Sequence, residues 1–157
     1  MFKLIASPLA WWPVIFAGVA EDGTVVENKI EMRFSILAED EFAEFIAASR
    51  RIDALVVDAE ALASAALQDG FIRRIVDRIG AAVGADKAHD TPPRIFKAAV
   101  LAEIVSDWRG VGAENGEALR YSLEHFAQLL NVPNVAEAVL TAYRACRAGR
   151  AEGRAGN

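Results

Sequence analysis

Residues 11–37 constrain the fold most, because their hydropathy pattern predicts a β-hairpin. Two strands are predicted, at residues 11–20 and 25–37, and Asp22-Gly23 between them is a hairpin turn signal. In the second strand, apolar and polar side chains alternate, as in a strand with one buried face. The apolar face is predicted to carry Ile30, Met32, Phe34 and Ile36, and the polar face Lys29, Glu31, Arg33 and Ser35.

The first strand is apolar on both faces. One face carries Trp12, Val14 and Phe16, and the other Trp11, Ile15 and Val19. Such a strand needs cover on both sides, and an isolated hairpin is barely stable in water. A hairpin packed on helices is the favoured interpretation, and pairing with another chain is the alternative.

The same apolar run also has features of a signal peptide. Lys3 precedes the run, and Gly18-Val19-Ala20 is a small-x-small pattern before Glu21. Pro8 and Pro13 interrupt it, however, and a strand is favoured. The run is too short for a membrane-spanning helix, which needs about 20 apolar residues.

Helical periodicity follows the hairpin and predicts an α+β fold with an N-terminal hairpin and a mostly helical C-terminal part. Helices are predicted at about 39–50, 71–83 and 94–108, and helical spacing is looser over 52–66. Two more helices are predicted to begin after the N-caps Ser122 and Asn134. The helix 94–108 is apolar around most of its circumference and is predicted to be central and buried. Thr91 is its expected cap, after a connection at 84–93.

One domain is predicted over residues 1–147, with the hairpin at about 11–37 and the helical part at about 39–147. Residues 148–157 are small and polar and are expected to form a flexible tail.

The segment 107–122 is predicted to form a structural corner. Asn115-Gly116 favours a type I′ turn, so the chain doubles back there. Leu119 and Tyr121 are then expected beside Trp108 and Val111.

Composition and charge exclude several functional classes. The 157 residues have a net charge of −5 and 25% charged side chains, which is typical of a folded protein without a nucleic-acid or anionic-membrane surface. The single cysteine excludes an intrachain disulfide and suits a reducing compartment.

No candidate catalytic or metal site combines the residues that its chemistry needs. The acids at 39–41 and Glu44 have no nearby histidine, and they are interpreted as a favourably charged helix start. Other candidates are interpreted as surface or core positions: Arg73 (with the i,i+4 spacing of an ion pair to Asp77), Arg74, Arg78, Glu103 with Asp107, His89, His125 and Cys146. The predictions are therefore no catalytic residue, no cofactor and no metal.

The corner and the segments after it resemble a known family. The order of several short motifs resembles that in the tail assembly chaperones of long-tailed bacteriophages. These motifs are Trp108-Arg109-Gly110-Val111, then Gly116, Leu119 and Tyr121-Ser122, then Leu129-Leu130 and the pair Ala142-Tyr143. The hairpin with its Asp-Gly turn and the strand ending at Phe34 before Asp40-Glu41 resemble the front half of that family. Residues 50–93 fit the family less well, and Ala38 stands where members usually carry a serine or threonine cap.

The resemblance implies a non-enzymatic protein of the bacterial host cytoplasm. It would bind the long helical tape-measure protein, and possibly the tail-tube protein, and keep the tape measure soluble until the tube polymerises. Family members often have a longer second product made by ribosomal frameshifting.

Trp11, Trp12 and Phe16 are the candidate residues for client binding or homo-oligomer formation, on the two-sided first strand. The alternatives are a structural subunit of the virion tail or neck and an unrelated small oligomeric adaptor. A small hydrolase would need a pocket with convergent perturbed groups.

Overall fold

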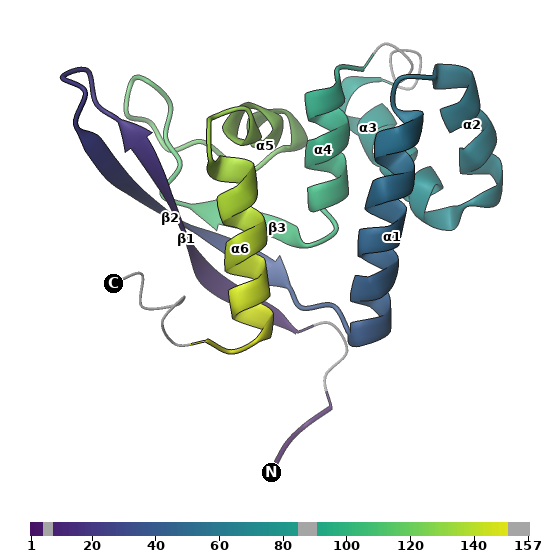
Figure 1. Cartoon of the computed structure of the whole chain (residues 1–157), viewed down its shortest axis with the longest axis horizontal. Helices are drawn as coiled ribbons and strands as arrows, with labels where there is room; N and C mark the ends of the chain where they lie inside the picture. The colour runs from purple at the N-terminus through teal and green to yellow at the C-terminus, as the bar shows by residue number, and fades with distance from the viewer. Residues whose placement is uncertain (5–7, 85–90, 151–157) are drawn as a thin grey trace.

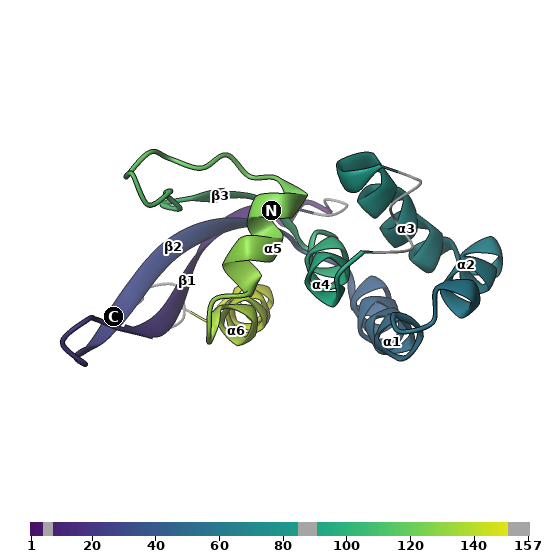
Figure 2. The ribbon, with the colours of Figure 1, turned by 90° about the horizontal axis from the view of Figure 1, so that it is seen from above.

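The structure is a computed structural model that describes residues 1–4, 8–84 and 91–150. It is an α+β fold, as predicted, in which helices cover one face of a three-stranded antiparallel sheet (Figures 1 and 2). The elements are β1 (Leu9–Val19), β2 (Val25–Ser35), α1 (Glu39–Leu55), α2 (Ala59–Gln68), α3 (Gly70–Val83), α4 (Pro93–Leu101), β3 (Val105–Arg109), α5 (Leu123–Leu130) and α6 (Val135–Arg147). The predicted tail lies mostly outside the described residues, which end at 150.

The predicted hairpin is confirmed in both strands and in its turn. Met32 pairs with Trp12 and Ile30 with Val14, so the apolar faces of the two strands coincide. Gly23 has a φ of 84°, and the Asp22 carboxylate accepts a hydrogen bond from the Thr24 amide at 2.9 Å. Ile30, Met32 and Phe34 are buried, as the alternation predicts.

The predicted helix at 94–108 is wrong in its second half. Helix α4 ends at Leu101, and the chain then pairs with β2 as strand β3, with Trp108 opposite Met32. The amide of Ser35 donates to the Ile104 carbonyl at 2.9 Å. The β2 edge would otherwise present unpaired backbone groups, and this long-range pairing overrides the local helical spacing.

Two of the three predicted helix caps differ in the structure, and the third is confirmed. Pro92, rather than Thr91, occupies the N-cap of α4, with Pro93 as the first helical residue. Asn134 has a φ of 70° and makes no capping hydrogen bond. Ser122 caps α5 as predicted, accepting from the His125 amide at 3.1 Å.

Tyr143 connects helix α6 to the end of strand β2. The Tyr143 hydroxyl donates to the Ser35 carbonyl at 3.0 Å and accepts from the Leu37 amide at 3.1 Å. Its ring packs edge-on against Phe34, with centroids 5.3 Å apart. Because both backbone groups lie where β2 ends, this side chain fixes the exit of the strand toward α1.

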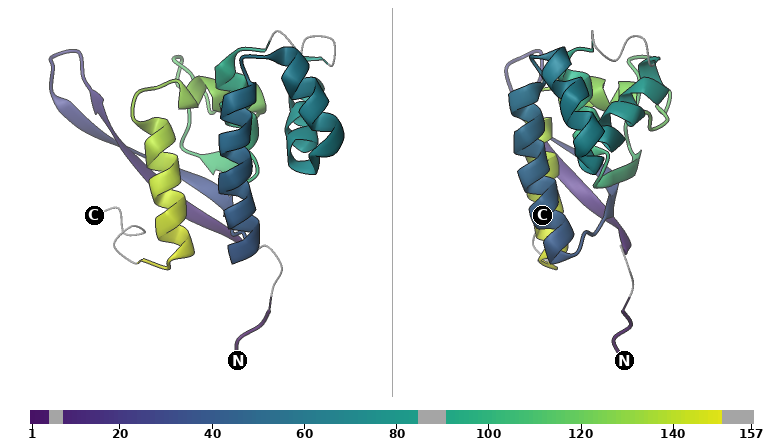
Figure 3. Two further views of the ribbon diagram at one scale, coloured as in Figure 1. Left: turned by 45° about the vertical axis from the view of Figure 1, so that its right-hand side comes forward. Right: turned by 90° about the vertical axis from the view of Figure 1, so that its right-hand side faces the viewer.

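Helices α1, α2 and α3 form a cluster beside the sheet, as the two views of Figure 3 show. The helix predicted at 39–50 continues to Leu55, and the looser spacing after it breaks at residues 56–58. Arg73 does not pair with Asp77; it donates to the carbonyls of Ala66 and Leu67 at the end of α2. Arg73 thus satisfies helix-end acceptors, a stronger role than a surface ion pair.

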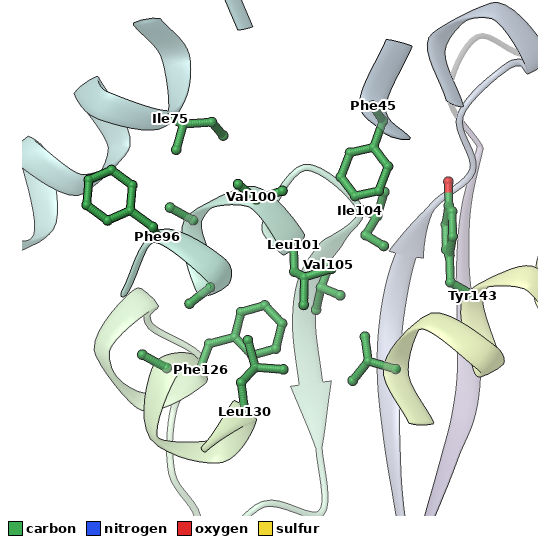
Figure 4. Close-up of a cluster of buried hydrophobic side chains, with 14 of the residues drawn as sticks. Phe45, Ile75, Phe96, Val100, Leu101, Ile104, Val105, Phe126, Leu130 and Tyr143 are labelled. Carbon is green, nitrogen blue, oxygen red and sulfur yellow. The ribbon is translucent and has the colours of Figure 1, made fainter. Parts of the chain in front are cut away.

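A continuous hydrophobic core joins the sheet to all of these helices. Helix α4 lies at its centre, with six of its nine residues buried, so the predicted central helix exists in a shorter form. Figure 4 shows Phe96, Val100 and Leu101 of α4 among side chains from α1, α3, α5 and β3. Among the described residues, no helix is long and apolar enough to cross a bilayer.

Candidate protein-binding groove

The three residues predicted to bind a partner do not form one surface. Trp12 lies on the face of β1 that packs on the helices and is 8% exposed. Phe16, on the same face, is partly buried against the core. Trp11 points to the opposite face of the sheet. Only Trp11 is therefore placed to meet a partner without unfolding the hairpin.

The face of Trp11 is already occupied by cations of the same chain. The Arg109 Cζ atom lies 3.7 Å from the centroid of the Trp11 ring, and the Arg33 Cζ atom lies 5.9 Å away. Arg109 also approaches the Glu31 carboxylate at 3.8 Å. These cation–π contacts stabilise the ring in place. They leave less of its surface for a partner.

The free edge of β1 is a second candidate for self-association, and two features obstruct it. Pro13 has no N–H to donate to an added strand. The Asn134 side chain donates to the Ala17 carbonyl at 3.2 Å. Proteins use such devices to prevent edge-to-edge pairing.

The corner closes on itself through hydrogen bonds and ring contacts. The Trp108 indole N–H donates to the Leu119 carbonyl at 2.7 Å, and the Leu119 amide donates to the Val111 carbonyl at 2.9 Å. Tyr121 packs edge-on against Trp108, and its hydroxyl donates to the Val105 carbonyl at 2.9 Å. The predicted return of Leu119 and Tyr121 beside Trp108 and Val111 is confirmed.

The type of turn at the corner differs from the prediction. Gly116 has a φ of 85°, but Asn115 does not have the positive φ that a type I′ turn requires. The Gly116 amide donates to the Ala113 carbonyl at 2.9 Å, and the Ala113 amide donates to the Glu117 carbonyl at 2.8 Å. This is a longer loop with glycine in the left-handed position. Gly110 is also left-handed, with a φ of 81°.

The remaining residues of the family pattern lie on α5 and α6. Leu130 is buried and Leu129 is partly buried on α5, which packs against α4, while Tyr143 is buried on α6 at the end of β2. The pattern therefore covers two packing sites, the corner and the contact of α6 with the sheet.

The candidate catalytic groups are distributed, and most have structural partners. Glu103 and Asp107 do not share a helix face as the proposed carboxylate pair requires, since Glu103 lies in the turn after α4 and Asp107 lies on β3. Glu103 instead accepts from Arg78 at 3.0 Å and Arg74 at 3.4 Å, and Arg78 also donates to the Ala99 carbonyl at 2.7 Å. The arginine face of α3, predicted to be solvated, thus connects α3 to α4.

The acidic start of α1 borders a hollow of about 330 Å³, lined by Leu37, Asp40, Glu41, Glu44, Phe45, Phe71, Arg74 and Glu103. Within the described part of the chain, no group of three or more His, Cys, Asp or Glu side chains is arranged to hold a metal ion.

His125 and Cys146 are the histidine and the cysteine that the structure describes, and they lie on different helices. His125 Nδ1 lies 2.8 Å from the Arg120 carbonyl, and His89 lies outside the described residues. Cys146 is half-buried, and burial raises the pKa of its thiol above the ordinary value. A raised pKa makes a thiol less reactive at neutral pH.

An apolar groove of about 400 Å³ opens between three helices that the sequence did not single out. Helices α1 and α6 form its walls and α4 its floor, with their axes running in roughly the same direction (Figures 1 and 2). The α1 wall is Phe45, Ile46, Ser49, Ile52, Asp53 and Val56. The floor is Pro93, Arg94, Phe96, Lys97, Val100 and Leu101, and α6 adds Leu140 and Arg144.

The spacing of the lining residues makes the groove a straight trough. The α1 positions recur every three to four residues from Phe45 to Val56, so they form one stripe along the helix. At a rise of 1.5 Å per residue this stripe is about 16 Å long. Phe45 and Ile52 are buried, and so are Phe96, Val100 and Leu101 of the floor. Ile46, Val56 and Leu140 are partly exposed along the opening.

The rim of the groove is basic in an acidic protein. Arg94, Lys97 and Arg144 are exposed around the opening, and Asp53 is the one carboxylate among the lining residues. None of these four side chains forms an ion pair within 4.0 Å with any residue of the ranges 1–4, 8–84 and 91–150. Three cations and one anion give the rim a charge of +2, whereas the whole chain carries −5.

The sequence offered only a weak signal for this groove. The apolar residues Phe45, Ile46, Ile52 and Val56 share one face of α1, and this face contains both buried and partly exposed members. Their spacing predicts one apolar face, but it does not predict that part of the face stays open, because the cover depends on where α4 and α6 lie.

Comparison of the chain with protein-family models, with curated proteins and with solved structures gave no match.

Proposed function

We propose that this protein is a non-enzymatic assembly chaperone that holds a long helical client in a bacterial cytoplasm, as tail assembly chaperones hold the tape-measure protein. The observation that supports this function best is the open apolar groove between α1, α4 and α6. Grooves lined by apolar side chains with a few polar groups at the rim are the usual sites for binding a partner segment. The resemblance at Trp108, Gly110 and Tyr121 supports the family to which this function belongs.

A holder must bind tightly enough to prevent aggregation and loosely enough to release its client. One groove about 16 Å long buries a modest apolar area, which suits weak contacts repeated along a long client. Binding of many copies along one chain raises the effective affinity without any single strong contact.

Co-expression tests the proposal directly. A gene for a very long helical protein beside this gene would identify the client, and the client should remain soluble with this chaperone and precipitate without it. Equal precipitation in both cases would contradict the proposal.

The composition of finished particles distinguishes the chaperone from a structural tail or neck subunit. A chaperone leaves when the tail tube polymerises, so mass spectrometry of mature virions should detect none of it. A stoichiometric amount in purified particles would favour the structural subunit instead.

A further inference from the structure

We propose that the groove of α1, α4 and α6 binds one amphipathic helix of about three turns, with acidic side chains flanking its apolar face. This inference rests on the proposed function, since it specifies the client segment that the chaperone would hold. It is carried by the shape of the groove, by the chemistry of its lining and by the charge of its rim.

The shape of the groove fits a helix. Its two walls and its floor are helices with roughly parallel axes, α1 running opposite to α4 and α6, so a fourth helix laid between α1 and α6 would complete a bundle (Figures 1 and 2). The α1 stripe from Phe45 to Val56 extends about 16 Å, the length of an 11-residue helix. Such a helix contacts a groove through apolar residues at positions i, i+3 or i+4, and i+7.

The lining of the groove lacks the groups that would recognise an extended strand. Strand addition uses a row of unpaired backbone N–H and C=O groups, and here the walls are helices whose backbone groups bond internally. Ser49, in the middle of the α1 stripe, donates its hydroxyl to the Phe45 carbonyl at 2.6 Å. Its short side chain leaves the space above it open.

The rim selects the charge of the occupant. Arg94 and Lys97 lie on α4 and Arg144 on α6, so cations lie on two of the three helices around the opening. They are exposed, and they have no carboxylate partner within 4.0 Å in the described ranges. Glutamate or aspartate beside the apolar face of a bound helix would supply those partners.

Two stapled helical peptides of about 14 residues test the inference, since unstapled helices of that length are marginal in water. Both carry the same leucine face, and the flanking positions are glutamate in one and lysine in the other. Fluorescence anisotropy with the full-length protein should show that the glutamate peptide binds about tenfold more tightly, with an advantage that shrinks as salt rises. Equal affinities would overturn the assignment of an acidic occupant.

Two variants locate the binding. Ser49→Phe fills the trough without removing a core side chain and should abolish binding, whereas Ser49→Ala should not. The triple reversal Arg94→Glu, Lys97→Glu and Arg144→Glu should invert the preference toward the lysine peptide. The matched reversal of three exposed cations outside the groove, Lys29→Glu, Arg50→Glu and Arg120→Glu, should keep the original preference at the same net charge. Binding that survives Ser49→Phe would place the peptide elsewhere.

The peptide assay and the co-expression assay can fail independently. If the protein keeps the tape-measure protein soluble but binds neither peptide, the proposed function stands and the assignment of an acidic helix to the groove is overturned. If the protein binds the glutamate peptide in the groove but leaves the client insoluble, the assignment of an acidic helix to the groove stands and the chaperone function is overturned.

Discussion

The corner at 107–122 and the groove of α1, α4 and α6 differ in whether their polar side chains have partners within the chain. In the corner, the polar atoms of Trp108 and Tyr121 have partners within the chain, at 2.7 Å to Leu119 and 2.9 Å to Val105. In the groove, the charged groups Arg94, Lys97 and Arg144 have no ion-pair partner within the described residues, and apolar side chains line open space. A region whose polar groups bond within the chain stabilises the fold, while an open apolar surface bordered by charges that face water is available to a partner.

This contrast separates two kinds of inference about function. The residues that carry the family resemblance lie mainly in the corner and on α5 and α6, where they hold elements of the chain's own fold together. The groove residues carry no family pattern, and they are the ones that a client would touch. Variants in the two regions should therefore separate stability from binding.

Trp108→Ala should give the largest loss of stability. The substitution removes a buried indole, its hydrogen bond to Leu119 and its ring contacts with Tyr121 and Phe126. Removing a buried tryptophan costs about 3–5 kcal/mol. Denaturant unfolding followed by circular dichroism measures the loss. A decrease below about 1 kcal/mol would contradict the structural role of the corner.

Trp12→Ser and Trp11→Ser should have unequal effects, although the residues are adjacent. Trp12 is 8% exposed on the core face, so its loss should cost about 3 kcal/mol. Trp11 is half-buried on the other face and is held by Arg109, so its loss should cost about 1 kcal/mol or less. Thermal melts of the two single variants compare them. Equal destabilisation would mean that the outer face of β1 contributes to the core.

The hairpin was predictable from the sequence because its signals are local. Alternation over 25–37 and the Asp-Gly turn are properties of neighbouring residues, and the structure has both. Strand β3 was not predictable, because Ile104, Val105 and Trp108 fit a helical stripe as well as a strand. Residues 105–109 form a strand because they pair with the free edge of β2, which lies more than 60 residues earlier in the chain.

The candidate site was predictable only in its components. The apolar residues of α1 and α4 were recognised as helical, but their arrangement around a groove depends on the breaks at 56–58 and at Leu101 and on the placement of α6. Trp12 was predicted to bind a partner because it is apolar. It is instead buried under the helices of the same chain, and their position could not be read from the sequence. Two-sided apolar strands indicate cover on both faces without specifying what covers them.

Alkaline pH should destabilise the corner through Tyr121. Burial raises the pKa of Tyr121 above the ordinary value near 10. Because the folded protein resists losing this proton, the contribution of Tyr121 to stability is complete below about pH 10 and declines as pH rises further. The decline is at most about 1.4 kcal/mol per pH unit for one group. Denaturant unfolding between pH 9 and 11 measures it.

Tyr121→Phe is the control for this pH effect, since it removes the ionisable hydroxyl and keeps the ring beside Trp108. The free energy of unfolding of this variant should depend less steeply on pH over the same range. Burial also raises the pKa of Tyr143, so a smaller dependence should remain. An unchanged slope in Tyr121→Phe would assign the alkaline loss to other groups.

Reversal of the groove rim should have the smallest effect on stability and a large effect on binding. Arg94, Lys97 and Arg144 are exposed, and substitutions at such positions usually change stability by about 0.5 kcal/mol or less. The triple glutamate variant should therefore unfold at nearly the same denaturant concentration as the parent while losing its preference for the glutamate peptide. Trp108→Phe should show the opposite pattern, with lower stability from the lost hydrogen bond to Leu119 and unchanged peptide affinity while folded. If the rim variant were instead the less stable of the two, the rim cations would have partners in the folded chain, and the contrast between a satisfied corner and an unsatisfied groove would be wrong.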